Sequence, residues 1–400
     1  MGSYLNPGNF SFRGSLRSKI YVDKSKLIAK TNEVLCTEQK YICVSRPRRF
    51  GKSMAANMLA AYYDRSENTE DLFQNLAISR EKSYEENLNQ YDVIKINMQE
   101  FLSMAGTIEK MLEMLKDYLV VDFEEAYPEV RFRDKNNLIQ TMKDVFFYTK
   151  CPFVILIDEW DCLFREYKQD KEAQKKYLDF LRAWLKDKDY IAMAYMTGIL
   201  PIKKYGSHSA LNMFTEYSMT DPGELAEYFG FTEPEVSAIC EKYGMSFEEA
   251  KTWYDGYQLV AHRQWKDECY SMYNPKSVVE AMLRHKFGTY WNQTETYEAL
   301  KIYIQMDMDG LKASVIRMLA GDSVPINTGT FSNDMTTFAT KDDVLTLLVH
   351  LGYLTYNSID GTVSIPNKEV SQEYINAIST MNWHGVADSV EASRKLLAFY

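Results

Sequence analysis

The sequence is poor in the residues that build metal centres and disulfide frameworks. Its six cysteines include no Cys-x-x-Cys pair, and its five histidines are scattered along 400 residues. These absences argue against a zinc site and against a disulfide-stapled secreted fold, and they suit a reducing cytoplasm. No apolar run approaches the roughly 18 residues of a membrane span, and the first nine residues do not begin a signal peptide. We therefore expect a cytoplasmic protein without a membrane partner.

A net positive charge is also absent, and this bears on the partners of the protein. The formal net charge of −10 argues against a general nucleic-acid-binding surface, so the charge does not support DNA as a partner. Residues 1–60 are the exception, because they hold eleven Lys and Arg against three Asp and Glu. An ordinary solvated surface would explain this excess. The grouping of Arg46, Arg48 and Arg49, however, favours an anionic ligand there.

The sequence does contain a series of short apolar runs, separated by segments with helical spacing. The run at 153–157, "FVILI", is typical of a strand buried on both faces of a parallel sheet. Strands that alternate with helices over residues 20–221 predict a three-layer α/β domain, with ligands at the carboxyl ends of the strands. The candidate strands are 41–45, 92–97, 153–157, 190–198 and 217–221.

The character of the chain changes after Pro222, and residues 223–322 are mostly helical in pattern. A capped helix then ends at Gly352 and is followed by a hairpin signal at Asp360-Gly361, an order typical of a winged helix. Few basic residues lie on that helix, which favours packing between domains over DNA binding. The expected domains are an α/β domain at 1–221, a helical lid at 222–330, and a winged-helix-like region with a C-terminal helix at 331–400.

Residues 44–54, "VSRPRRFGKSM", resemble a phosphate-binding loop in which arginine replaces the first glycine. Gly51 would let the backbone approach a phosphate, Lys52 would reach the β- and γ-phosphates, and the Ser53 hydroxyl would ligate Mg²⁺. A strand-like run before the loop and helical spacing behind it supply the context that such a loop requires. The alternative is a Gly-Lys-Ser turn that precedes a helix by chance.

The rest of this loop completes the candidate nucleotide site. Arg48 and Arg49 would neutralise phosphate charge, or else they are surface residues. Asp23 lies before the first strand, where it would contact adenine or, alternatively, cap a helix. The predicted nucleotide-binding residues are Arg46, Pro47, Arg48, Arg49, Phe50, Gly51, Lys52, Ser53, Met54 and Asp23.

A second motif, "FVILIDEWD" at 153–161, ends a buried strand in two carboxylates. Asp158 would hold Mg²⁺ directly or through water, and Glu159 would activate a water for attack on the γ-phosphate. Thr197, at the end of the next strand, would sense the γ-phosphate or the water, or would only cap a turn. The two motifs together predict a site for ATP and Mg²⁺ with Lys52, Glu159 and Thr197 as catalytic residues. The adjacent glutamate favours an ATPase over a nucleotide kinase.

An ordered set of motifs carries a family resemblance over roughly residues 5–375. The set includes "YVDKSKLI" (21–28), "SRPRRFGKS" (45–53), "LIDEWD" (156–161), "MTGIL" (196–200) and "WYDGYQ" (253–258). Together they resemble the bacterial predicted AAA-ATPase-like family of P-loop NTPases, which is related to the STAND signal-transduction ATPases. In that family the first loop glycine is also commonly arginine. Members often carry a C-terminal PD-(D/E)XK nuclease-like domain, for which this chain lacks the length and the pattern. Either the sequence is part of a longer chain or the protein lacks that domain, so we assign no nuclease activity.

The resemblance and the motifs predict an ATPase that acts as a conformational switch under the control of Mg²⁺ and ATP. ATP would clamp the α/β core against the helical lid and the winged-helix-like region, and hydrolysis to ADP would release it. One alternative is a non-hydrolysing nucleotide-binding scaffold that works through partner proteins. Another is a DNA-binding regulator that uses residues 335–370. Both a protein partner and a second copy of this chain are compatible with the sequence.

Overall fold

The computed structural model describes residues 2–202, 211–262, 266–291, 296–306, 308–333 and 335–379. The chain divides into two compact units. The first contains Met1–Ser45, Gly51–Tyr217 and Asp334–Thr336, and the second contains Arg46–Phe50, Ser218–Asn333 and Thr337–Tyr400. A short piece of the N-terminal sequence therefore belongs to the second unit.

The first unit is built on a five-stranded parallel sheet with the order β2-β3-β4-β1-β5. Every residue of β1, β3 and β4 is buried, because helices cover both faces of the sheet. The α/β fold expected from the sequence is thus confirmed. The strands are β1 (Tyr41–Ser45), β2 (Asp92–Asn97), β3 (Phe153–Asp158), β4 (Ile191–Gly198) and β5 (Thr215–Tyr217).

The fifth strand differs from the prediction. We expected it at 217–221, but β5 ends at Tyr217. The backbone amide of Ser218 donates to the carbonyl of Asp221 at 2.8 Å, and the Ser218 hydroxyl accepts from the Asp221 amide at 3.2 Å. These bonds close a turn over the residues that had been taken as a strand.

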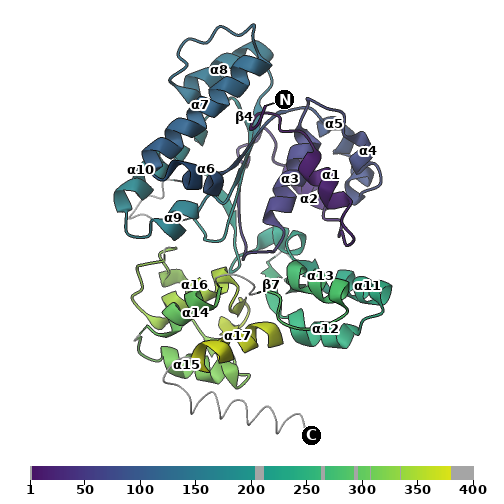
Figure 1. The fold of residues 1–400 in the computed structure, drawn as a ribbon, viewed down its shortest axis with the longest axis vertical. Helices are drawn as coiled ribbons and strands as arrows, with labels where there is room; N and C mark the ends of the chain where they lie inside the picture. The colour runs from purple at the N-terminus through teal and green to yellow at the C-terminus, as the bar shows by residue number, and fades with distance from the viewer. Residues whose placement is uncertain are drawn as a thin grey trace. The chain divides into compact units, whose positions relative to one another are not determined.

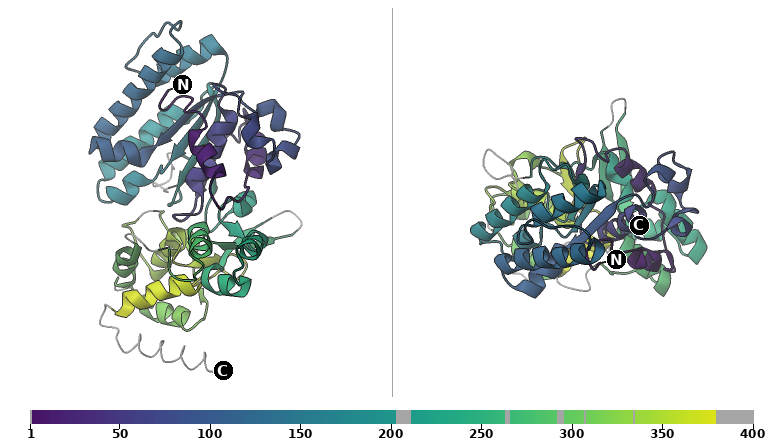
Figure 2. Two further views of the ribbon diagram at one scale, coloured as in Figure 1. Left: turned by 45° about the vertical axis from the view of Figure 1, so that its right-hand side comes forward. Right: turned by 90° about the horizontal axis from the view of Figure 1, so that it is seen from above.

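Helices cover the two faces of the sheet in two groups (Figures 1 and 2). The chain crosses from β1 to β2 in one direction and returns through β3 to β4, so the connecting helices fall on opposite faces. One group is α1 (Phe10–Leu16), α2 (Lys26–Asn32), α3 (Lys52–Tyr63), α4 (Glu70–Phe73), the 3-10 turn η1 (Ala77–Arg80) and α5 (Tyr84–Asn87). The other is α6 (Met98–Ala105), α7 (Ile108–Ala126), α8 (Leu138–Thr149), α9 (Cys162–Glu166) and α10 (Lys171–Leu185).

The second unit combines helices with two small antiparallel sheets, of order β6-β8-β7 and β10-β11-β9. The first of these sheets was not expected in a region that reads as mostly helical. Its elements up to residue 284 are η2 (Gly223–Tyr228), β6 (Phe231–Thr232), α11 (Glu233–Tyr243), α12 (Phe247–Tyr254), β7 (Tyr257–Ala261), β8 (Glu268–Tyr273) and α13 (Pro275–Arg284).

The rest of the second unit contains the predicted helix and hairpin. α16 begins at a capping box formed by Thr340 and Asp343 and ends at Gly352, whose φ is +88°. Naming this region a winged helix stays a prediction, and residues 380–400 of the expected C-terminal helix lie outside the described residues. The elements are α14 (Thr296–Ile304), α15 (Leu311–Leu319), β9 (Val324–Pro325), η3 (Thr328–Thr330), α16 (Lys341–Leu351), β10 (Thr355–Asn357), β11 (Thr362–Ser364) and α17 (Lys368–Ser379). Among the described residues, none of the helices combines the length and apolar composition that crossing a membrane requires.

One carboxylate fixes the N-terminal segment beside the edge strand β2. Asp122 of α7 accepts hydrogen bonds from the backbone amides of Ser3, Tyr4 and Leu5, at 3.2, 2.7 and 2.9 Å. Leu5 in turn forms an antiparallel bridge with Ile94 of β2. The segment therefore covers a sheet edge that would otherwise expose its backbone groups.

We expect Asp122→Ala to lower the free energy of unfolding by about 2–3 kcal/mol, because three backbone amides lose their acceptor. Urea denaturation measures this loss. The control is Asp117→Ala, which removes an exposed carboxylate from the same helix. That variant should stay within about 0.5 kcal/mol of the wild type. Equal midpoints for the two variants would contradict the assigned role of Asp122.

Candidate functional site

Lys52 is the centre of the candidate site. It is the first residue of α3 and follows Gly51, whose φ of +91° lies in the left-handed region that favours glycine. Lys52 is only 5% exposed. Burial lowers its pKa, and the carboxylates of Glu159 and Asp158 act in the opposite direction. A buried ammonium group thus lies at the amino end of a helix, close to two carboxylates.

Asp158 and Thr197 meet at the carboxyl edge of the sheet. Asp158 is the last residue of β3, and Thr197 is in the last pair of residues of the neighbouring strand β4. The Thr197 hydroxyl donates a hydrogen bond to the Asp158 carboxylate, and both side chains are buried. Thr197 therefore fixes the carboxylate that the sequence assigned to Mg²⁺.

Glu159 adopts a backbone conformation that is uncommon for a glutamate, with φ of +54°. Its amide donates to Asp158 Oδ1 at 3.0 Å, and its carboxylate forms an ion pair with Arg165 of α9. Burial raises the pKa of Glu159, while Arg165 and Lys52 act to lower it. The glutamate is thus held between two cations.

Asp161 and Arg165 were not assigned by the sequence reasoning, although they complete this cluster. Asp161 is fully buried and accepts hydrogen bonds from the amides of Ile199 and Leu200, at 3.0 and 2.8 Å. Arg165 Nε lies 3.3 Å from Asp161 Oδ2. The spacing of four residues, which places an aspartate and an arginine on one helical face, is the sequence signal that could have indicated this pair.

Lys95 of β2 is the third cation near the site, after Lys52 and Arg165. The sequence reasoning did not assign it. Its ammonium donates to the side-chain carbonyl of Asn57 on α3. Burial lowers the pKa of Lys95, and Asp158 acts against that change. Three cations and three carboxylates therefore balance at this edge of the sheet: Lys52, Lys95, Arg165, Asp158, Glu159 and Asp161.

Among the other predicted residues of the first unit, Ser53 and Met54 are exposed on the first turn of α3. Asp23 is placed differently. Its two carboxylate oxygens accept from the amides of Ser25 at 2.8 Å and Ala77 at 2.7 Å. These contacts fix the corner between α2 and η1, and a contact of Asp23 with adenine stays a prediction.

The loop residues before Gly51 belong to the second unit and are packed there. Arg46 is fully buried, with its guanidinium 5.5 Å from the centre of the Phe229 ring. Arg49 donates to main-chain carbonyls of the same unit, Phe50 is fully buried, and Arg48 is exposed. The predicted loop is thus divided, with Gly51, Lys52 and Ser53 in one unit and residues 46–50 in the other.

The donor set fits magnesium chemistry. Mg²⁺ prefers hard oxygen ligands, and proteins usually hold it through one or two carboxylates together with phosphate oxygens and water. Asp158 and the hydroxyl of Ser53 would supply such oxygens. The described residues contain no group of three or more His, Cys, Asp or Glu side chains that could hold a metal ion by themselves.

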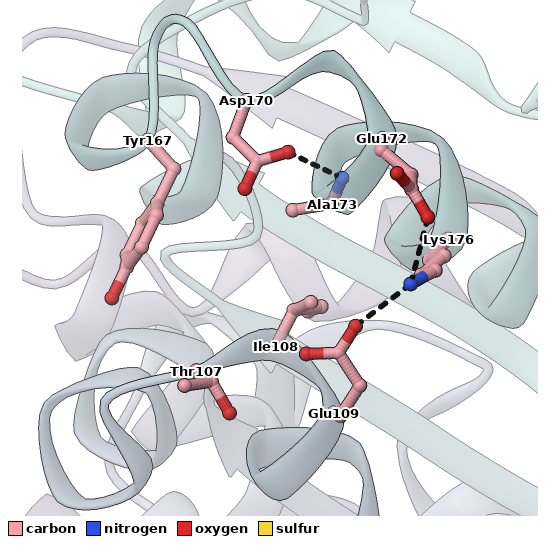
Figure 3. Close-up of a pocket in the computed structure, with 8 residues that line it drawn as sticks. All are labelled: Thr107, Ile108, Glu109, Tyr167, Asp170, Glu172, Ala173 and Lys176. Atoms are coloured by element: carbon pink, nitrogen blue, oxygen red, sulfur yellow. Dashed lines mark hydrogen bonds and ion pairs between the residues drawn. The ribbon is translucent and has the colours of Figure 1, made fainter.

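A hollow of about 250 Å³ lies elsewhere in the first unit (Figure 3). Lys176 bridges Glu109 at 2.9 Å and Glu172 at 3.0 Å across it. None of the predicted nucleotide-binding residues line this hollow. The lining residues are Thr107, Ile108, Glu109, Tyr167, Asp170, Glu172, Ala173 and Lys176.

A known family model matches the region of the chain that contains this cluster. Residues 12–207 match the family model described as a predicted AAA-ATPase. Over this range the chain is similar to the predicted AAA-ATPase family. The match supports nucleotide binding by a P-loop, and the matched range contains the whole Lys52 cluster. The family resemblance seen in the sequence is thereby confirmed, whereas the relation to STAND ATPases and to nuclease fusions stays a prediction.

The chain is also similar to individual proteins. An uncharacterised protein encoded in the region 5′ of vnfD in Azotobacter chroococcum mcd 1 is 24% identical over 287 residues, which are 69% of this chain and 51% of that protein. The chain thus spans about half the length of this curated relative.

Two solved structures from Aeropyrum pernix also align with this chain. The ORC2 protein, solved as ADPNP and ADP complexes, has 8% identity and a TM-score of 0.36 over 95% of this chain and 98% of its own. The ORC1 protein in complex with DNA has 11% identity and a TM-score of 0.29 over 96% and 99%. TM-scores of this size do not establish a shared fold.

Proposed function

We propose that the protein is an ATPase that acts as a conformational switch controlled by ATP and Mg²⁺. The observation that carries this proposal is the convergence of Lys52, Asp158, Glu159 and Thr197 at the carboxyl edge of one parallel sheet. Ligands of open α/β sheets bind at this edge. The match of residues 12–207 to the predicted AAA-ATPase family model supports the same conclusion.

Each side chain has a role in the proposed reaction. The Lys52 ammonium would neutralise the β- and γ-phosphates, and its desolvated position makes that attraction stronger than it would be in water. Ser53 and Asp158 would hold Mg²⁺, which supplies further neutralisation of the phosphate charge. Thr197 would keep Asp158 oriented through its hydrogen bond. Glu159 would accept a proton from the attacking water.

The ion pair between Glu159 and Arg165 favours a second candidate function. A carboxylate held by a guanidinium is a weaker base, and it accepts a proton from water only if that contact loosens. A protein in which the contact persists would bind nucleotide without turning it over. This is the non-hydrolysing scaffold, which would work through partner proteins.

Lys52→Ala should abolish binding of ATP with Mg²⁺, because it removes the buried cation that would neutralise the phosphates. Isothermal titration calorimetry measures this loss, and circular dichroism checks that the variant is folded. Lys143→Ala, an exposed lysine of α8, is the control and should bind like the wild type. An affinity of Lys52→Ala for ATP equal to that of the wild type would contradict the assignment of Lys52 to the nucleotide site.

Glu159→Gln should retain nucleotide binding and lower ATP turnover by about 10²–10⁴-fold, the usual contribution of a general base. The isosteric amide keeps the shape of the side chain and removes its basicity. Phosphate release under saturating ATP measures turnover. Slow turnover that this substitution leaves unchanged would support the scaffold instead.

Arg165→Gln should move the acid limb of the turnover profile to higher pH. The guanidinium lowers the pKa of Glu159, so its removal raises that pKa and leaves more of the base protonated at a given acidic pH. Arg165→Lys retains a positive charge and should restore much of the wild-type profile. Superimposable profiles for wild type and Arg165→Gln would show that Arg165 does not set the ionisation of Glu159.

A further inference from the structure

The five residues that replace the usual flexible part of the phosphate loop are held by the second unit. Residues 46–50 lie between Ser45 and Gly51 in the chain, yet they cluster with residues that follow Tyr217. Arg49 adopts φ of +71°, and Gly51 adopts φ of +91°, so the chain turns sharply on its way to Lys52. Such conformations persist where the surroundings impose them.

Arg49 and Glu369 bind the same two peptide units. The Arg49 guanidinium donates to the carbonyl of Tyr290 at 3.0 Å and to the carbonyl of Trp291. Glu369 Oε1 accepts from the amides of Tyr290 and Trp291, at 2.6 and 2.8 Å. Glu369 is 2% exposed, and its charge attracts Arg49. Glu369 therefore fixes the backbone that carries the acceptors for Arg49.

The neighbours of Arg49 are held in the same unit. The carbonyl of Phe50 accepts from the amide of Gly230 at 3.1 Å, and its ring packs edge-on against Tyr257 with centres 5.0 Å apart. Pro47 packs against Gly352, where an added Cβ would lie 2.8 Å from the Cβ of Pro47. Gly352 thus ends α16 in a left-handed conformation, and its lack of a side chain also allows Pro47 to approach closely.

We propose that Arg49 and Glu369 are positioning residues of the phosphate loop, through which the second unit sets the affinity of the loop for nucleotide. This inference rests on the proposed function. Neither residue needs to touch the phosphates: Glu369 fixes residues 290–291, these hold Arg49, and Arg49 fixes the backbone that leads to Gly51 and Lys52. By thermodynamic reciprocity, nucleotide binding must also stabilise this part of the second unit.

The test compares Glu369→Ala, Glu369→Gln and Arg49→Ala in the full chain, with ADP and Mg²⁺ as the probe. Calorimetry should show affinity about 5- to 150-fold weaker for Glu369→Ala and for Arg49→Ala, the usual range of such coupling. Glu369→Gln should recover most of the affinity, because its amide oxygen can still accept from residues 290 and 291. Glu241→Ala, an exposed glutamate of α11, is the matched control.

Hydrogen exchange supplies a second readout, which can be made both without nucleotide and with it. In the free protein, Arg49→Ala should speed exchange in peptides that contain residues 286–291, which a residue that only binds phosphate would not do. In the wild type, ADP with Mg²⁺ should slow exchange in the same peptides. If Glu369→Ala does not fold, the same affinity and exchange measurements on Glu369→Gln and Arg49→Ala test the proposal.

The outcomes separate this inference from the proposed function. A wild-type protein that binds no nucleotide would overturn the proposed function itself. Nucleotide binding that is unaffected in a folded Glu369→Ala variant would overturn the positioning role alone. Weak binding in Arg49→Ala, with normal binding in Glu369→Ala and unchanged exchange at 286–291, would instead make Arg49 a direct phosphate ligand.

Discussion

The buried ammonium of Lys52 is the constraint on which the site depends. An isolated charge in a protein interior is costly unless opposite charges and hydrogen bonds compensate it. Asp158 and Glu159 provide that compensation, since both follow the apolar core of β3 directly. Asp161 and Arg165 extend the network to the turn after β4. The ends of β3 and β4 and the start of α3 are thus held together by charge as well as by packing.

A balanced cluster of this kind suits a ligand that brings its own charges. Phosphates would attract Lys52, and Mg²⁺ would attract Asp158, so each charged group would keep an opposite partner when the ligand binds. The loop before Gly51 contributes in another way. Arg46 and Arg49 of this loop interact within the second unit. In the proposed function, Lys52 and Asp158 would bind the charges of the ligand, whereas Arg46 and Arg49 would hold the backbone of the loop.

Much of this architecture could be predicted from local sequence. Apolar runs located β1 to β4, and they placed Asp158 and Thr197 at the carboxyl ends of successive strands, where ligands of such sheets bind. β5 was misplaced because the side chain of Ser218 closes a turn. The sheet of β6, β8 and β7 was missed because β6 has only two residues and pairs with a strand about forty residues later.

The packing of the loop could not be predicted at all. The partners of Arg49 lie some 240 residues further along the chain, and Glu369 is further still. No local periodicity encodes such contacts. The basic composition of the loop suggested phosphate contacts for all three arginines, whereas burial of Arg46 and the carbonyl acceptors of Arg49 become visible only in the folded chain.

The most direct test of the central claim is a crystal structure of the full chain with Mg²⁺ and a non-hydrolysable ATP analogue. The account predicts that the β- and γ-phosphates lie within hydrogen-bond distance of Lys52 Nζ, with the metal at Ser53 Oγ and near the Asp158 carboxylate. Nucleotide bound at any other place, with Lys52 still enclosed by carboxylates alone, would contradict it.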